Sequence, residues 1–135
     1  MILFVLIALP QPSLTPETHH IMNRETIAQM PRGSFLINTS RGGVVDVPAV
    51  LDAITSGHLG GSGIDVLETE PPSAEHPLLQ AWRDPAHPAH DRLILNPHSA
   101  LYSEEGLMDM RIKDSENCRR ALLGQPVRNL VNGAM

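Results

Sequence analysis

Cysteine and lysine are each represented by a single residue, and both scarcities limit what this 135-residue chain can be. With Cys118 as the only cysteine, no internal disulfide can form, which excludes the disulfide-stapled secreted domains. Cys118 falls on an apolar position of an expected helix, so we predict that it packs. Lys113 is the only lysine, the net charge is −5, and no run of like charge occurs. The sequence therefore lacks the basic surface of a nucleic-acid-binding protein, and a small molecule or another protein is the expected partner.

A hydrophobic segment long enough to span a membrane is also missing. The apolar run over residues 1–10 is far shorter than the ~20 residues that a membrane-spanning helix needs. No basic residue precedes it and no small-residue cleavage site follows it, so we expect no secretion signal. We therefore predict a cytoplasmic protein without membrane contact. Because the run is rich in Ile, Leu, Val and Phe and stops at Pro10, it predicts a strand over residues 2–9, buried on both faces.

The rest of the sequence predicts strands and helices in alternation, with room for one ordinary domain. The expected strands cover residues 34–38, 63–66 and 92–96, and the expected helices cover residues 24–30, 46–56 and 103–123. Asn23, Asp46 and Ser103 are the expected N-caps, and Gly57 is the expected C-terminal glycine. Residues 60–63 predict a turn, and residues 73–91, rich in Pro and His, predict an irregular excursion. Strands that alternate with helices favour an α/β fold with a parallel sheet.

Three loops that follow expected strands carry residues with complementary chemistry. In an open α/β sheet, ligands bind beyond the carboxyl ends of the strands, where we expect these loops to meet. Arg41 offers a permanently charged, planar fork of donors that suits a carboxylate. His98 can give or take one proton near neutral pH, and Glu70 can fix the histidine tautomer and stabilise the imidazolium. Such a set suits interconversion of a 2-hydroxy acid and a 2-keto acid, with a nicotinamide exchanging the hydride.

Four motifs in order along the chain resemble those of the D-isomer-specific 2-hydroxyacid dehydrogenase family. The motifs are Leu14-Thr-Pro-Glu-Thr18 with His20 and Asn23, then Asn38-Thr-Ser-Arg-Gly-Gly43, Asp65-Val-Leu-Glu-Thr-Glu-Pro71 and Asn96-Pro-His-Ser-Ala100. The resemblance extends from about residue 5 to residue 123. Any one motif could arise by chance, whereas the ordered set indicates the family. It implies the later half of a Rossmann-like NAD-binding domain.

The resemblance also implies a role for each matching residue. Arg41 binds the substrate carboxylate, His98 is the acid/base, and Glu70 pairs with His98. Asp65 faces the nicotinamide carboxamide, and the backbone around Thr39 and Ser40 lines the cofactor, together with Arg41 and His98. Pro10 or Pro12 stands against the nicotinamide, and the sequence does not decide between them. The expected cofactor is NAD, with NADP possible, and the expected substrate is a small 2-hydroxy or 2-keto acid.

The 135 residues hold no G-x-G-x-x-G loop and no acidic residue placed to bind the ribose, both of which that family uses for the dinucleotide. We therefore expect a partial fold whose first half is absent, a chain that is inactive alone, and an exposed edge on its first strand. The expected divisions are residues 1–100 as the later half of the NAD-binding domain, residues 101–123 as a long linking helix, and residues 124–135 as a tail.

Other functions remain open from the residues alone. The stretch from His98 to Glu105 also resembles the branch of the C-terminal-binding-protein corepressors, although Leu101 stands where that branch carries an aromatic residue. A non-enzymatic interaction protein with the same fold is thus the alternative, and a functionless remnant is a third reading. Full-length relatives are expected to form homodimers. Which 2-hydroxy acid is used stays undetermined.

Two groups of histidines are predicted to have structural roles. His76, His87 and His90 fit no compact zinc signature, so no metal site is predicted. His19 and His20 are expected to have a surface or capping role. The apolar stripe of the helix over residues 103–123 is expected to pack on the sheet.

Overall fold

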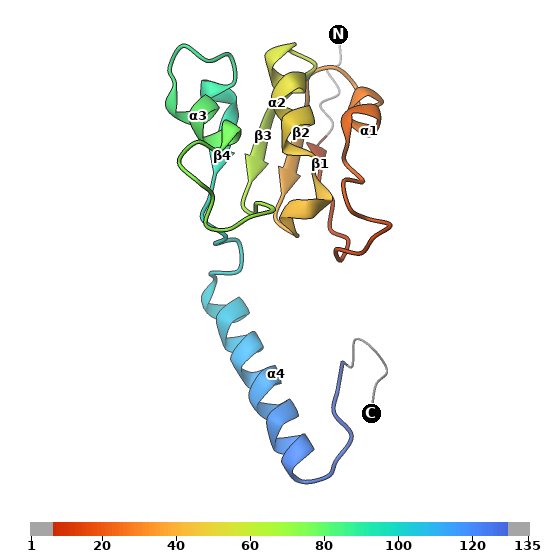
Figure 1. Cartoon of the computed structure of the whole chain (residues 1–135). Coiled ribbons are helices and arrows are strands. Elements are labelled where there is room, and N and C mark those ends of the chain that lie inside the picture. The colour runs from red at the N-terminus through yellow and green to blue at the C-terminus, as the bar shows by residue number, and fades with distance from the viewer. Residues whose placement is uncertain (1–6, 130–135) are drawn as a thin grey trace. The chain divides into compact units, whose positions relative to one another are not determined.

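A computed structural model describes residues 7–129 of the chain, which divide into two compact units (Figure 1). The first unit comprises residues 1–99 and the second residues 100–135, and each is described by itself. Within the described residues, no helix combines the length and the apolar character needed to cross a membrane.

The first unit is built on a four-stranded parallel sheet. Its strands are β1 (Ile7–Ala8), β2 (Ser34–Asn38), β3 (Leu59–Ile64) and β4 (Leu93–Leu95), arranged in the order β1-β2-β3-β4. Leu36 pairs with Ser62, and Ile64 pairs with Leu95, so the carboxyl ends of β2, β3 and β4 reach the same edge. The predicted α/β fold with a Rossmann-like parallel sheet is confirmed.

Helices connect the strands, and the first two begin at the predicted capping residues. The connecting helices are α1 (Arg24–Ala28), α2 (Val47–Thr55) and α3 (Pro77–Arg83), with 3-10 turns η1 (Gly42–Val44) and η2 (His90–Arg92). The Asn23 side chain accepts hydrogen bonds from two backbone N–H groups of α1, and Asp46 accepts one from Ala49. Gly57 follows α2 with φ of +69°, which glycine adopts without a steric penalty.

The hydrophobic core lies on the face of the sheet that α1 and α2 cover. Leu36 and Leu59 of the strands and Ile54 of α2 are completely buried there. Figure 1 shows α2 in front of β2 and β3. On β2 and β4 the alternate residues are exposed, with 39% of Phe35 and 69% of Ile94 accessible. One face of the sheet is therefore packed while apolar side chains on the other face remain exposed.

The structure corrects the expected path between β2 and β4. The predicted turn over residues 60–63 is wrong, because these residues form the middle of β3. A Cβ on Gly60 would lie 2.7 Å from the Gly33 carbonyl oxygen, and one on Gly61 would lie 2.7 Å from that of Arg92. Glycine is needed there for close approach of backbone inside a sheet. The expected irregular excursion over residues 73–91 is also wrong, since it contains α3 and the start of η2.

The first strand differs from its prediction as well. Most of the predicted strand over residues 2–9 lies outside the described residues, and its described part is β1. Burial on both faces is not found there, because Ile7 is 52% exposed. Among the described residues, β1 pairs only with β2 and lies at the edge of the sheet.

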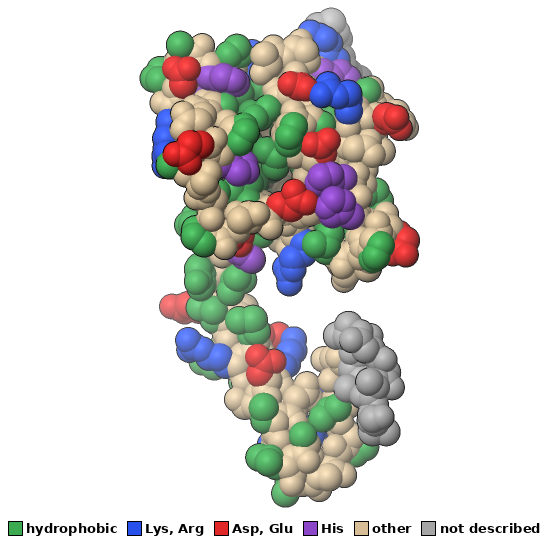
Figure 2. All heavy atoms as spheres, viewed as in Figure 1, with side chains coloured by type: hydrophobic (Ala, Val, Ile, Leu, Met, Phe, Trp, Pro, Cys, Tyr) green, Lys and Arg blue, Asp and Glu red, His purple; other side chains and the backbone are tan. Residues whose placement is uncertain are grey.

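The second unit contains one long helix, α4 (Glu104–Leu122), which begins at the predicted cap Ser103. None of its residues is buried, and apolar side chains are visible along it in Figure 2. Met108 and Ile112, for example, are more than half exposed, at 56% and 58%. The predicted packing of this stripe on the sheet involves both units and stays a prediction. The Cys118 thiol is exposed on α4, which does not agree with the packing role predicted for it.

Candidate active site

The loops that follow β3 and β4 bring Glu70 and His98 into direct contact. The His98 imidazole Nδ1 lies 2.7 Å from Glu70 Oε2, a short hydrogen bond between half-exposed side chains. The second carboxylate oxygen, Oε1, accepts a hydrogen bond of 2.8 Å from the Leu67 backbone N–H. Because both oxygens are held, the carboxylate has one orientation toward the imidazole. The predicted pairing of Glu70 with His98 is confirmed in geometry.

The two hydrogen-bond donors that contact Glu70 also favour the ionised form of its carboxyl group. The Leu67 backbone N–H, followed by the His98 imidazole, holds the pKa of the Glu70 carboxyl below its usual range, although partial burial opposes them. The carboxylate is therefore ionised at neutral pH. An ionised acceptor fixes the proton of the imidazole on Nδ1 and leaves Nε2 as the nitrogen that can exchange a proton.

Asp65 positions His98, which the sequence reading did not anticipate. The backbone of His98 has φ of +53°, a left-handed conformation that non-glycine residues rarely adopt. The His98 N–H donates to the Asp65 carbonyl at 2.8 Å, and the next N–H, of Ser99, donates to Asp65 Oδ1 at 2.8 Å. Asp65 is only 4% exposed, so it forms a buried clamp around the strained residue.

The loop that carries Arg41 is shaped by buried Asn38 at the end of β2. The Asn38 side chain donates to the Arg41 carbonyl at 3.0 Å and accepts hydrogen bonds from the backbone N–H and the hydroxyl of Ser40. Arg41 itself is exposed, and its Nη1 donates to the carbonyl of Ser40 at 2.7 Å. No ion pair joins Arg41 to Glu70 or to any other acidic residue of the described chain.

Gly42 allows the backbone of the Arg41 loop to pack directly against the backbone of the Glu70 loop. A Cβ built on Gly42 would lie 1.9 Å from the carbonyl carbon of Leu67 and 2.2 Å from the backbone nitrogen of Glu68. Only glycine allows two backbones to approach this closely. The two loops are thus in van der Waals contact, and the Asn38 carbonyl accepts the N–H of Asp65 at 2.9 Å. The predicted convergence of the three loops is confirmed for their backbones.

The residues predicted to contact the cofactor lie at the same edge of the sheet. Thr39 is exposed at the end of β2, and its hydroxyl accepts a hydrogen bond of 2.9 Å from the Gln11 side chain, in the segment after β1. Pro10, half-buried, precedes Gln11. Ser40 is 9% exposed and directs its hydroxyl to Asn38, so its side chain is engaged in the loop itself.

A cavity of about 450 Å³ lies beside the Glu70–His98 pair within the first unit. Most of its wall is apolar and comes from β4, from α3 and from the segment after β3, including Leu79, Trp82 and Leu95. The three histidines of the region after residue 73 do not extend this site. Their hydrogen bonds join His76 to the start of α3, His87 to the Ala89 N–H and His90 to the Trp82 carbonyl.

A parallel α/β sheet that carries a histidine–carboxylate pair at its carboxyl edge defines the class of the protein as a Rossmann-like domain. Residues 4–100 match the family described as D-isomer specific 2-hydroxyacid dehydrogenase, NAD binding domain. Because this match covers most of the chain, the chain belongs to that family, as its motifs predicted.

Individual relatives agree with the family match. The chain is 35% identical over 125 residues to a D-lactate dehydrogenase of Treponema pallidum (strain Nichols), covering 89% of this chain and 37% of the relative. It is 34% identical over 119 residues to a D-3-phosphoglycerate dehydrogenase of Bacillus subtilis (strain 168), covering 88% and 21%.

A solved structure supports the same conclusion. A D-isomer specific 2-hydroxyacid dehydrogenase from Xanthobacter autotrophicus Py2, in complex with NADPH and MES, superposes with a TM-score of 0.74 at 36% identity. The alignment covers 93% of this chain and 48% of that one. The chain thus spans about a fifth to a half of the length of these relatives. The relatives' names differ in substrate, so they do not select one for this protein.

Proposed function

We propose that this chain supplies the proton-transfer half of an NAD(P)-dependent D-2-hydroxyacid dehydrogenase site, which interconverts a 2-hydroxy acid and a 2-keto acid. The observation that carries the proposal is the 2.7 Å contact between His98 Nδ1 and Glu70 Oε2 at the carboxyl edge of the parallel sheet. A histidine oriented by an ionised carboxylate is well suited to general acid–base catalysis.

His98 is the acid/base of this proposal, and its Nε2 handles the proton. In the oxidative direction Nε2 accepts the proton of the substrate hydroxyl, and in the reductive direction the imidazolium returns it to the keto oxygen. Glu70 stabilises the imidazolium because its carboxylate faces Nδ1, and it holds the ring in one tautomer. Asp65 positions His98 for this proton transfer, because it accepts hydrogen bonds from the backbone N–H groups of His98 and Ser99.

Arg41 binds the substrate carboxylate. The guanidinium is exposed at the end of β2, next to the loop of Glu70, so a carboxylate can reach it from solvent. Two parallel hydrogen bonds to the substrate carboxylate would orient the neighbouring C2 atom and its oxygen toward His98. Recognition by Arg41 would also select against compounds that lack a carboxylate.

The described residues fit the nicotinamide end of a dinucleotide. Pro10, Thr39 and Asp65 follow adjacent strands at one edge, and the Gln11–Thr39 hydrogen bond shows that the first two segments meet. A nicotinamide held by these residues would supply the hydride chemistry, with C2 of the hydroxy acid as donor in one direction and C2 of the keto acid as acceptor in the other. The family description names NAD and the X. autotrophicus structure holds NADPH, so both cofactors remain compatible with the proposal.

The isolated 135 residues hold no glycine-rich loop for the diphosphate, and we propose that they neither bind NAD tightly nor turn over substrate. When the purified chain is mixed with pyruvate, glyoxylate or hydroxypyruvate, we expect no NADH oxidation above background. Robust oxidation, abolished by His98→Asn, would contradict this part of the proposal and leave the assignment of His98 intact.

A chimera tests the catalytic assignment itself. The matching segment of the T. pallidum D-lactate dehydrogenase is replaced by this chain, and NADH oxidation is measured with a panel of 2-keto acids. We expect turnover with at least one acid, and a loss of about 10²–10⁴-fold in kcat when His98→Asn removes the acid/base. Arg41→Lys is expected to raise KM, because a lysine cannot form the paired hydrogen bonds.

A chimera that folds and binds NADH, yet turns over no acid, would overturn the proposal. It would favour the alternative of a non-enzymatic interaction protein, which stays a prediction. The expected homodimer of full-length relatives also stays a prediction.

A further inference from the structure

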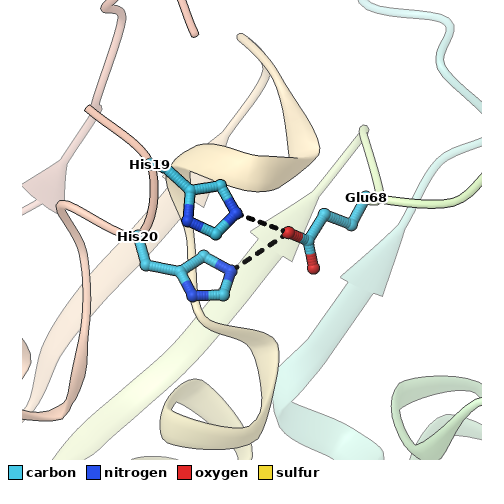
Figure 3. Close-up of side chains that lie close together, drawn as sticks. All are labelled: His19, His20 and Glu68. Atoms are coloured by element: carbon cyan, nitrogen blue, oxygen red, sulfur yellow. Dashed lines mark hydrogen bonds and ion pairs between the residues drawn. The ribbon is translucent and has the colours of Figure 1, made fainter. Parts of the chain in front are cut away.

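His19, His20 and Glu68 form a cluster of potential metal ligands outside the Glu70–His98 pair (Figure 3). His19 Nε2 lies 2.8 Å, and His20 Nε2 3.2 Å, from the same carboxylate oxygen, Glu68 Oε1. The two imidazole rings stack, with centroids 4.0 Å apart and planes inclined by 23°, which brings both Nε2 atoms to one side. All the ligand atoms lie within 4.8 Å of one another.

A hydrogen bond explains the position of only one of the two imidazoles. His19 Nε2 is hydrogen-bonded to Glu68. His20 Nε2 is buried from solvent and forms no hydrogen bond, and its 3.2 Å contact with Glu68 Oε1 is an ion pair only when the imidazole is protonated. A buried polar nitrogen without a hydrogen-bond partner is costly in a folded protein. An ion placed between the three side chains would satisfy this nitrogen.

The backbone holds both sides of the cluster in place. His20 has φ of +50°, and its N–H donates to the Gly43 carbonyl at 2.7 Å. The His19 N–H donates to the Thr15 carbonyl at 3.0 Å, which closes the preceding turn. On the other side, the backbone of Glu68 is packed against Gly42. The ligands are thus presented by two segments, separated by about fifty residues of sequence, that contact the same Gly42–Gly43 backbone.

We propose that His19, His20 and Glu68 bind one divalent transition-metal ion of the zinc class. Two imidazole nitrogens with one carboxylate oxygen are a ligand set of zinc sites that keep an open position, whereas magnesium and calcium prefer oxygen ligands. Bonds of about 2.0–2.1 Å place neighbouring ligands of a tetrahedral ion about 3.3 Å apart. The separations of 2.8 and 3.2 Å between the imidazole nitrogens and Glu68 Oε1 are close to that value, and all three ligand atoms lie within 4.8 Å of one another, so rotations of the side chains would bring them to one ion.

The ion would join the segment before α1 to the loop that carries Glu70. Glu68 lies between Leu67, whose N–H holds the Glu70 carboxylate, and Glu70 itself. Binding would therefore stabilise the loop of the acid–base pair without contacting that pair. This inference departs from the sequence-based prediction that no metal is bound, and it does not depend on the proposed dehydrogenase function.

Metal titration of the 135-residue chain tests the site. Zn²⁺ binding is measured by calorimetry in a Cys118→Ser background, which removes the exposed thiol as a competing ligand. The ligand variants are His20→Asn, which tolerates a positive φ, and Glu68→Gln, which removes the charged ligand. The matched control is His87→Asn, because it removes a histidine from another loop. Substitution with Co²⁺ adds a visible absorption band that reports the ligand geometry.

We expect one Zn²⁺ per chain, and a loss of affinity of at least about tenfold in either ligand variant, with His87→Asn unchanged. Zinc should also raise the Tm of the parent chain but not that of Glu68→Gln, because only the folded parent binds it. If His20→Asn fails to fold, Glu68→Gln decides alone, since Glu68 is exposed. Absence of saturable binding, or equal affinity in all four chains, would overturn the proposal.

Discussion

At the scale of single residues, the candidate site depends on buried polar side chains that hold its loops. Asn38 and Asp65 are 1% and 4% exposed, and each satisfies several polar groups of a loop that carries a catalytic candidate. Their hydrogen bonds to the loop backbones stabilise loop conformations that are otherwise strained or exposed. His98 can therefore keep φ of +53°, and Arg41 can extend into solvent on a fixed backbone.

Gly42 gives the sharpest prediction at this scale. Gly42→Ala should destabilise the fold by about 3 kcal/mol, the upper part of the usual range for overpacking, because the new Cβ would meet the Leu67 backbone at 1.9 Å. Gly63→Ala is the matched control, since its Cβ would meet only the Ile37 side chain at 3.5 Å. We expect Gly63→Ala to be neutral or to stabilise β3 by about 0.5–1 kcal/mol.

Urea unfolding followed by circular dichroism measures both glycine variants. Equal free energies of unfolding for Gly42→Ala and Gly63→Ala would show that the Arg41 and Glu70 loops separate easily. The proposed rigid contact between them would then be wrong.

At the scale of elements, α4 is held by local interactions because none of its residues is buried. Glu116 pairs with Arg119 three residues later and with Arg120 four residues later. The Arg119 guanidinium, assisted by Arg120, lowers the pKa of Glu116 to about 2. Pairs at these spacings stabilise exposed helices, and salt weakens them.

The helix should consequently lose stability in acid. Because the folded pKa of Glu116 lies below its ordinary value of 4.5, its ionised form stabilises α4 at higher pH. This contribution is lost as the pH falls from about 4.5 toward 2. The helical circular dichroism signal should therefore fall more in the parent chain than in Glu116→Gln over that interval.

Asp114→Asn is the control for the acid prediction, because Asp114 joins none of the ion pairs found in the described chain. It should keep the parent's pH dependence. If Asp114→Asn flattens the profile as much as Glu116→Gln does, the Arg119 and Arg120 pairs are not the cause.

At the scale of the whole molecule, the main feature is a parallel sheet with one open apolar face. Parallel sheets are ordinarily covered on both faces. Here Leu36 and Leu59 are buried under α1 and α2, while Phe35 and Ile94 are 39% and 69% exposed. An exposed apolar face of this kind favours association with another protein surface.

We therefore expect the purified chain to self-associate through that face. Ile94→Glu should shift the distribution toward the monomer in sedimentation velocity experiments, because a charge in the interface must be desolvated. Ile112→Glu on α4 is the control, since Ile112 is similarly exposed, at 58%. Dissociation by Ile112→Glu alone would assign the association to α4 and contradict the prediction for the sheet.

Features that depend on neighbouring residues were predictable from the sequence alone. Asn23, Asp46 and Ser103 cap the helices as expected, because a side-chain oxygen reaches backbone N–H groups two or three residues away. The pairing of Glu70 with His98 was also predictable, because parallel strands present their following loops at one edge. α3 was missed, although the sequence offered a helix signal there, with Pro77 at its first position after the capping residue His76.

Tertiary structure decided whatever depends on residues distant in sequence. The glycines of β3 read as a turn because their composition is that of turns, and only the close approach of the Gly33 and Arg92 carbonyls explains them in a strand. Likewise, His19 and His20 meet Glu68 only because Gly42 and Gly43 bring their two segments together. The sequence by itself determined the family and indicated that Glu70 pairs with His98. The fold decided which backbones touch, because close approach depends on three-dimensional packing that no local pattern encodes.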